Sequence, residues 1–155
     1  MSDHIRHCRT SPDPVLCCLQ RAVTIAVVGF SANPERPSHY VAAYLADQGY
    51  KVIPVNPGLA GQVWRGQIIV ADLVAAFAEG PVDIVDVFRQ PDAVPAITDA
   101  AIACGGGCLW LQSGIVHAAA AEAARAAGML VVMDACLMVE HRLRAAQIRN
   151  NRSHV

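Results

Sequence analysis

The feature that most constrains the fold is a short apolar run followed by a polar loop and a helical pattern. Ile25 to Val28 are apolar and mostly β-branched, which is typical of a strand buried on both faces of a parallel sheet. Gly29 ends the run, and apolar residues at helical spacing resume at Tyr40. Strand, tight loop and helix in this order form the opening unit of a nucleotide-binding α/β domain, where the helix N-terminus meets a phosphate group.

The loop departs from the dinucleotide fingerprint G-x-G-x-x-G, because Ser31 and Pro34 stand at its second and third glycine positions. A single glycine after a strand fits an ordinary turn about as well as a phosphate loop. A phosphate-bearing ligand is favoured by side chains that combine one permanent cation with hydroxyl and amide groups, beside a first-turn proline. These loop residues are Ser31, Asn33, Arg36, Pro37 and Ser38.

Apolar runs and helical patterns alternate along the rest of the chain, with no internal repeat. This alternation predicts an α/β fold: a Rossmann-like doubly wound parallel sheet of five to six strands with helices on both faces. The 155 residues suffice for one such domain, which we assign to residues 13–149, between a flexible leader at 1–12 and a disordered tail at 150–155. The expected strands lie at 25–28, 51–55, 68–69, 82–88, 108–111 and 130–133, and the expected helices at 13–21, 38–48, 71–78, 92–104, 116–127 and 137–149.

The end of the second expected strand argues against a nicotinamide cofactor. Asn56 and Pro57 stand where an NAD-binding domain usually carries an acid for the ribose 2′-hydroxyl, and no basic residue is there for NADP. Ligands of doubly wound sheets bind beyond the carboxyl ends of the strands. The segments expected at that edge are 29–38, 56–58, 88–91 and 112–114.

Composition argues against several classes of partner. Charged residues make up 16% and the net charge is −1, which gives no electrostatic support for nucleic acid or an anionic membrane. No uncharged apolar run reaches the length of about 18 residues that a membrane span needs. Without a recognisable signal peptide, we expect all six cysteines to be free thiols in a cytoplasmic protein. Cys104 and Cys108 lack the second pair of ligands that a zinc site needs, so no metal is expected.

Five segments, in order along about Leu16 to Arg142, carry a family resemblance. They are Ala26–Ser31 with Arg36–Ser38, Val55–Pro57, Val82–Arg89, Leu109–Gly114, and Asp134–Cys136 with Glu140–Arg142. Together they resemble the small bacterial and archaeal CoA-binding proteins, a family similar to the CoA-binding domain of the succinyl-CoA synthetase α subunit.

The resemblance implies coenzyme A, or an acyl-CoA, bound along the strand ends. The loop at 29–38 would hold its phosphates with Arg36 as the main cation, the second strand's end would border the adenosine, and the pantetheine would pass Phe88 and Arg89. The implied cofactor-binding residues are Gly29, Phe30, Ser31, Asn33, Arg36, Pro37, Ser38, Val55, Asn56, Pro57, Phe88, Arg89 and Gln112.

No catalytic residue is assigned. We expect His117 to be a helix cap or a solvated histidine, Cys136 a buried thiol, and Glu140 and His141 surface or packing groups. The leading hypothesis is therefore a non-catalytic binding or regulatory module for CoA or an acyl-CoA, with no protein partner identified. The alternative is a small enzyme acting on an acyl thioester or a nucleotide through Cys136, His117 or Asp134.

Overall fold

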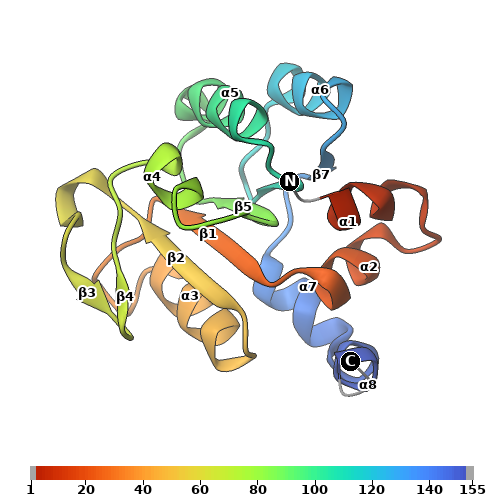
Figure 1. Cartoon of the computed structure of the whole chain (residues 1–155), viewed down its shortest axis with the longest axis horizontal. Helices are drawn as coiled ribbons and strands as arrows, with labels where there is room; N and C mark the ends of the chain where they lie inside the picture. Colours follow the sequence, from red (N-terminus) through yellow and green to blue (C-terminus); the bar gives the residue numbers. More distant parts are fainter. Residues whose placement is uncertain (1–2, 153–155) are drawn as a thin grey trace.

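The computed structural model describes residues 3–152, and a sheet of five parallel strands runs through their centre (Figure 1). The spatial order β2-β1-β5-β6-β7 confirms the predicted Rossmann-like class, and it reverses direction between β1 and β5 as in other doubly wound sheets. The strands are β1 (Thr24–Val28), β2 (Lys51–Val55), β5 (Ile84–Val87), β6 (Cys108–Leu111) and β7 (Leu130–Val132). The helices are α1 (Asp3–Arg6), α2 (Pro14–Arg21), α3 (Pro37–Asp47), α4 (Leu73–Phe77), α5 (Val94–Cys104), α6 (Ala118–Ala126), α7 (Leu137–Leu143) and α8 (Ala145–Arg152), with 3₁₀ turns η1 (His7–Thr10), η2 (Pro57–Leu59) and η3 (Pro91–Ala93).

Alternate strand residues face two different helical layers. Ile25 and Val27 of β1 pack in the cluster that includes α2, α3 and α7, whereas Ala26 and Val28 pack in the cluster of α4, α5 and α6. Figure 1 shows these two groups of helices on opposite sides of the sheet. Because both faces are covered, the strand is apolar at every position rather than at every second one.

Gly29 lies where the chain leaves β1, at the point where the strand order reverses. Its φ is +88°, and a Cβ at this position would lie 2.7 Å from the carbonyl oxygen of Phe88 in the loop after β5. Both the backbone conformation and the close approach require glycine. The loops at the carboxyl ends of β1 and β5 therefore approach each other closely, backbone to backbone, at Gly29 and Phe88.

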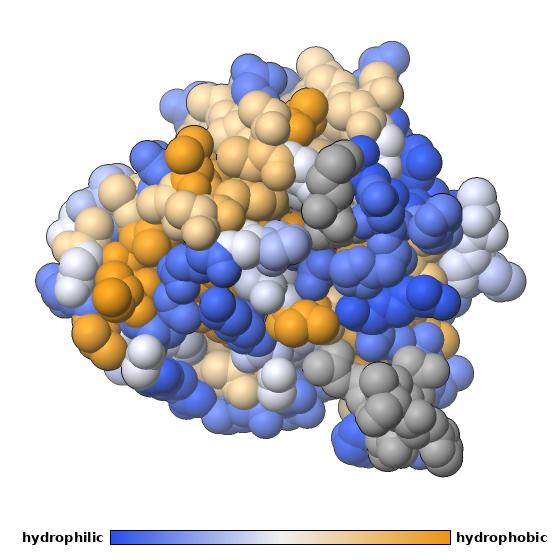
Figure 2. All heavy atoms as spheres, in the orientation of Figure 1, coloured by the Kyte–Doolittle hydropathy of each residue, from blue (hydrophilic) through white to orange (hydrophobic). Residues whose placement is uncertain are grey.

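The sixth strand that the sequence allowed does not join the main sheet. Instead β4 (Gln67–Ile68) pairs antiparallel with β3 (Val63–Trp64) in a separate hairpin, and Figure 2 shows apolar surface over it. Arg65 and Gly66 between the strands have φ of 51° and 78°, as a two-residue type I′ turn requires. Strands of two residues are too short for an alternating pattern, so the hairpin could not be found from periodicity.

The structure differs from the expected flexible leader over residues 3–10, which form α1 and η1. His4 Nε2 lies 3.1 Å from Asp83 Oδ1 at the amino end of β5. The Arg6 guanidinium donates hydrogen bonds to the carbonyl oxygens of Gly106 and Ala127, at 3.1 and 3.0 Å. These partners are far away in sequence, so local composition does not reveal them. Residues 1 and 2 lie outside the described part of the chain.

Cys8 and Cys17 form a disulfide, so the prediction of six free thiols is wrong. The chain turns back between η1 and α2, which brings the two Cα atoms to 5.5 Å, a separation that a disulfide spans. The cytoplasmic location, from which the free thiols were expected, stays a prediction. The free cysteines among the described residues are Cys18, Cys104, Cys108 and Cys136.

The disordered tail expected at 150–155 begins as the last turn of α8, which continues to Arg152. Residues 153–155 lie outside the described part. Between residues 3 and 152, no helix combines the length and the apolar character needed to cross a membrane.

Candidate functional site

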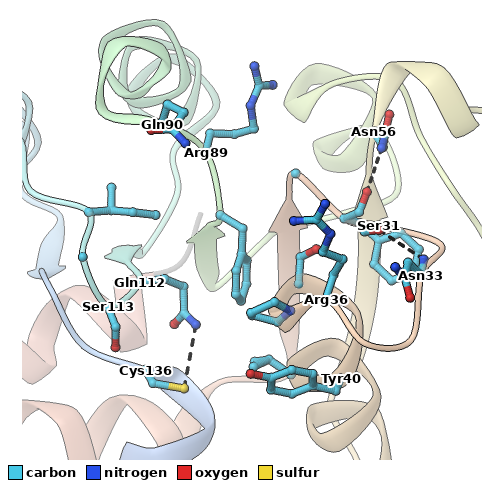
Figure 3. Close-up of a pocket in the computed structure, with 18 of the residues that line it drawn as sticks. Ser31, Asn33, Arg36, Tyr40, Asn56, Arg89, Gln90, Gln112, Ser113 and Cys136 are labelled. Carbon is cyan, nitrogen blue, oxygen red and sulfur yellow. Dashed lines mark hydrogen bonds between the residues drawn. The ribbon is translucent and has the colours of Figure 1, made fainter.

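A cleft of about 1100 Å³ opens at the carboxyl ends of β1, β5 and β6, beside the first turns of α3 and α7. In Figure 3, Ser31 and Arg36 lie on one side of it and Gln112 and Cys136 on the other. Most of the predicted binding residues meet here. They are Gly29, Phe30, Ser31, Asn33, Arg36, Pro37, Ser38, Asn56, Phe88, Arg89 and Gln112.

Asn33 shapes the loop after β1. Its Oδ1 accepts a hydrogen bond from the Glu35 N–H at 3.0 Å, and its carbonyl oxygen accepts one from the Arg36 N–H at 3.0 Å. Its own N–H donates to Ser31 Oγ at 3.1 Å. These hydrogen bonds use the backbone N–H groups of Asn33, Glu35 and Arg36 and fix the path of the loop that presents the Arg36 side chain.

The charged side chains that line the cleft, among those described for residues 3–150, are Arg36 and Arg89. Arg36 directly precedes α3 and is exposed, and Figure 3 shows its guanidinium between Ser31 and Gln112. Arg89 follows β5, and its guanidinium extends away from Arg36. Two permanent cations without a lining carboxylate produce a positive potential, which favours an anionic ligand.

A second pocket of about 500 Å³ adjoins the cleft, and Gly29, Asn56 and Arg89 line both. The Asn56 side chain ties the two neighbouring loops together. Its Nδ2 donates to the Phe30 carbonyl oxygen at 2.7 Å, and its Oδ1 accepts from the Gly58 N–H at 2.8 Å. Asn56 therefore builds the wall between the pockets. The mostly apolar remainder of the second pocket includes the predicted residues Val55 and Pro57, with Val28, Leu73, Ala96 and Ile97.

Gln112 organises the end of the cleft opposite Arg36. Its side-chain oxygen accepts a hydrogen bond from the Leu137 N–H at 2.9 Å, and its Nε2 lies 3.9 Å from Cys136 Sγ. The first turn of α7 is thereby held at the cleft, with Met138 and Val139 in its lining. Sequence analysis missed these two residues, because helical spacing does not show that the chain returns from β7 across the strand ends.

Other lining residues were also missed as binding residues, although six of them fall in segments expected at the strand ends. Those six are Ala32, Gly58, Gln90, Pro91, Ser113 and Gly114. The remaining ones are Tyr40, Val41, Leu59, Ile115 and Cys136.

Three aromatic rings pack between the loop after β1 and the hairpin. Phe30 stacks on His39 with ring centroids 5.3 Å apart, and Trp64 lies 5.1 Å from Phe30 and 5.8 Å from His39. His39 Nδ1 lies 2.8 Å from the Ser31 carbonyl oxygen, so this nitrogen donates a hydrogen bond. Trp64 therefore anchors the hairpin by packing against the Phe30 and His39 rings.

In the described part of the chain, the candidate catalytic residues do not form a nucleophile–base pair. Cys136 lines the cleft, but its hydrogen-bond partner is an amide. His117 Nδ1 accepts the Ala120 N–H at 3.1 Å and caps α6, as expected. Asp134 Oδ1 accepts the Gly114 N–H at 2.7 Å. Residues 3–152 also hold no group of three or more His, Cys, Asp or Glu side chains placed to bind a metal ion.

Glu140 and His141 are packing groups, as predicted. His141 is buried, and its Nδ1 lies 2.8 Å from the Tyr44 hydroxyl. Glu140 Oε2 accepts a 2.6 Å hydrogen bond from Arg144 on the same face of the helix.

The Asp86 carboxyl group is buried away from both pockets and has no hydrogen-bond partner among the described residues. Asp86 belongs to β5 and is 0% exposed. Burial therefore raises the pKa of Asp86 well above its ordinary value. Burial also raises the pKa of the neighbouring Cys108 thiol, with further contributions from Cys18 and Asp86.

A doubly wound sheet with an arginine-lined cleft at its switch point defines a Rossmann-like ligand-binding domain. Residues 23–142 match the family described as the CoA binding domain, and the chain belongs to that family. This confirms the resemblance seen in the sequence.

Relatives share this fold over most of their length. The chain is 36% identical over 125 residues to the uncharacterized protein YneT of Bacillus subtilis (strain 168), covering 79% of this chain and 88% of YneT. It is 47% identical to the solved structure of cell-free ID.343 from Thermus thermophilus, with a TM-score of 0.77, covering 81% of this chain and 92% of that one. A hypothetical protein from Pyrococcus horikoshii OT3 is 29% identical with a TM-score of 0.76, covering 92% and 91%.

Proposed function

We propose that this protein binds CoA or an acyl-CoA at the carboxyl ends of its parallel strands, as a non-catalytic binding or regulatory module. The observation that carries the proposal is the charge of the cleft: among the side chains of residues 3–150, Arg36 and Arg89 are its charged lining groups. CoA carries a diphosphate and a ribose phosphate, so it is complementary to this lining. Membership of the CoA binding domain family supports the same class of ligand.

The strand order supports a direction for the ligand. We place the diphosphate at the loop 29–38 beside Arg36, and the adenosine against Val55 to Pro57 in the second pocket. Neighbouring strands lie about 4.8 Å apart, so the loops after β1 and β6 are separated by about 10 Å. The pantetheine arm crosses this distance past Phe88 and Arg89 and brings its sulfur to the end of the cleft at Gln112.

Two contacts support a binding role without chemistry: the Cys136 sulfur faces the Gln112 amide, and His117 caps a helix. A small enzyme acting on an acyl thioester or a nucleotide is the alternative, and the observation that favours it is the opening of the Cys136 thiol onto the cleft. Mass spectrometry after incubation with acetyl-CoA separates the two. Released CoA or acetylated protein supports the enzyme, whereas unchanged protein and thioester support the binding module.

The binding proposal is tested by calorimetric titration with CoA, dephospho-CoA, NAD and ATP. CoA should bind most tightly, since it is the only one of these ligands that carries both the 3′-phosphate and the pantetheine arm. Folded protein that does not bind CoA would overturn the proposal. Equal binding of all four ligands would reduce the site to a general nucleotide pocket.

A further inference from the structure

We infer that the cleft is built for an acyl-CoA whose acyl group is uncharged and apolar. The inference rests on the proposed function and concerns the side of the cleft opposite Arg36, where the proposed function places the sulfur of the ligand. We call this part the acyl end. Its lining residues are Gln112, Ser113, Ile115, Cys136, Met138 and Val139.

The acyl end contains apolar groups and neutral polar groups. Ile115 and Met138 are partly buried, and Val139 is 45% exposed to the open cleft. The polar groups are a hydroxyl, an amide and a thiol, and the amide oxygen of Gln112 is already bonded to the Leu137 N–H. An acyl chain would therefore cover exposed apolar side chains here, which stabilises the complex.

Arg36 lies opposite the acyl end, the Arg89 guanidinium extends away from Gln112 and Cys136, and the arginines of α7 and its C-cap are occupied. The Arg142 guanidinium lies over the Tyr44 ring, 4.9 Å from its centroid. Arg144 is held by Asp13 and Glu140, at 3.2 and 2.6 Å. A carboxylate on the acyl group would thus meet no lining cation at this end among the side chains of residues 3–150.

Asp134 adds a negative charge behind the acyl end. It is exposed, and its Oδ1 is held by the N–H of Gly114, which itself lines the cleft. Its carboxylate would repel a second carboxylate placed on the acyl group. Dicarboxylic acyl groups are therefore disfavoured twice, by the absence of a lining cation and by the presence of an acid.

Butyryl-CoA and succinyl-CoA provide a matched pair of ligands for the test. Both acyl groups have four carbons, and succinyl carries a terminal carboxylate where butyryl has a methyl group. Each buried methylene strengthens binding about fourfold, whereas a carboxylate must stay hydrated. By calorimetry, butyryl-CoA should bind about tenfold more tightly than both succinyl-CoA and acetyl-CoA.

Two variants, each of which introduces an arginine into α7, test whether the preference for butyryl-CoA arises at the acyl end. Val139→Arg places a cation at the acyl end and should shift the succinyl-to-butyryl affinity ratio about tenfold toward succinyl-CoA. Leu143→Arg is the control, because Leu143 lies one turn further along α7, is 73% exposed and does not line the cleft. Melting curves check that both variants are folded. If one of them is not, the comparison of butyryl-CoA with succinyl-CoA on the wild-type protein tests the inference by itself.

Equal affinities for the two ligands, or tighter binding of succinyl-CoA, would overturn the inference and leave the proposed function intact. So would a Leu143→Arg variant that shifts the ratio as much as Val139→Arg. If folded wild-type protein binds no CoA species at all, the proposed function fails together with the inference.

Discussion

The side-chain oxygen of Gln112 accepts a 2.9 Å hydrogen bond from the backbone N–H of Leu137, which joins the end of β6 to the start of α7. Gln112 is only 5% exposed, so this bond is shielded from water. Met138 and Val139 follow directly and line the cleft. One buried hydrogen bond therefore positions both the end of a strand and one wall of the candidate site.

Replacing Gln112 with alanine should leave the Leu137 N–H without its partner. We expect the free energy of unfolding to fall by about 1–3 kcal/mol, and CoA to bind several-fold more weakly because the start of α7 is no longer held. Urea unfolding and calorimetry measure the two effects. Ser113→Ala is the control, since Ser113 also lines the cleft but is exposed. Unchanged stability in Gln112→Ala would contradict the structural role of the bond.

The phosphate-binding role of Arg36 predicts a specific loss of affinity. A charge-assisted hydrogen bond contributes about 1.5–3 kcal/mol, so Arg36→Ala should weaken CoA binding about ten- to a hundredfold while the fold survives. Arg36→Lys should recover part of the loss, because a point charge lacks the planar fork of the guanidinium. Arg21→Ala, an exposed arginine of α2 outside both pockets, is the control. Wild-type affinity in folded Arg36→Ala would move the phosphates elsewhere.

NAD should bind far more weakly than CoA, and supplying an acid at position 56 should not create an NAD site. The Asn56 amide donates to the Phe30 carbonyl oxygen, and an aspartate would place a carboxylate against that oxygen instead. Asn56→Asp should therefore lose about 1–3 kcal/mol of stability and gain no NAD affinity. Calorimetry with both ligands and urea unfolding test this. NAD binding comparable to that of CoA in the wild-type protein would refute the expectation.

The disulfide should be visible by thiol counting. Denatured protein without reductant should expose four reactive thiols, and reduction should release those of Cys8 and Cys17 as well. Closing a loop with a separation of 9 residues stabilises the fold by about 2–3 kcal/mol, which Cys17→Ser should lose. Cys104→Ser removes a free, partly buried thiol and is the control. Six reactive thiols in unreduced protein would rule out the pairing.

Asp86 should make the protein less stable as the pH rises. In the unfolded chain its pKa is the ordinary 3.8, while burial raises the pKa in the folded protein, so only the unfolded state releases the proton as the pH climbs above about 4. The stability contributed by the neutral group is complete below that pH and falls by up to about 1.4 kcal/mol per pH unit until the folded pKa is reached. Asparagine cannot titrate, so the unfolding free energy of Asp86→Asn should rise relative to that of the wild type as the pH increases above about 4. A difference that does not change with pH would contradict the raised pKa.

Several features followed from the sequence because they depend on neighbouring residues. A continuous apolar run such as 51–55 indicates a strand covered on both faces, and the structure places β2 at those residues. Asp13 followed by Pro14 predicts the start of α2, and the Asp13 side chain accepts the Leu16 N–H as a cap. Arg36 and Gly29 stand in a loop that directly follows a strand, so their place at the carboxyl edge of the sheet needed no tertiary information.

Only the tertiary structure decided which distant segments complete the site. Met138 and Val139 line the cleft because α7 returns beside β6, and Cys8 meets Cys17 because the chain reverses after η1. Trp64 reaches Phe30 through a hairpin whose strands are two residues long. The local sequence sets the backbone conformation of each segment and the face of each helix or strand that is buried. The contacts between distant segments depend instead on the order of the strands and on the paths of the connections between them. That order is settled by packing the whole core at once, because each helix is stable only where its apolar face meets the sheet.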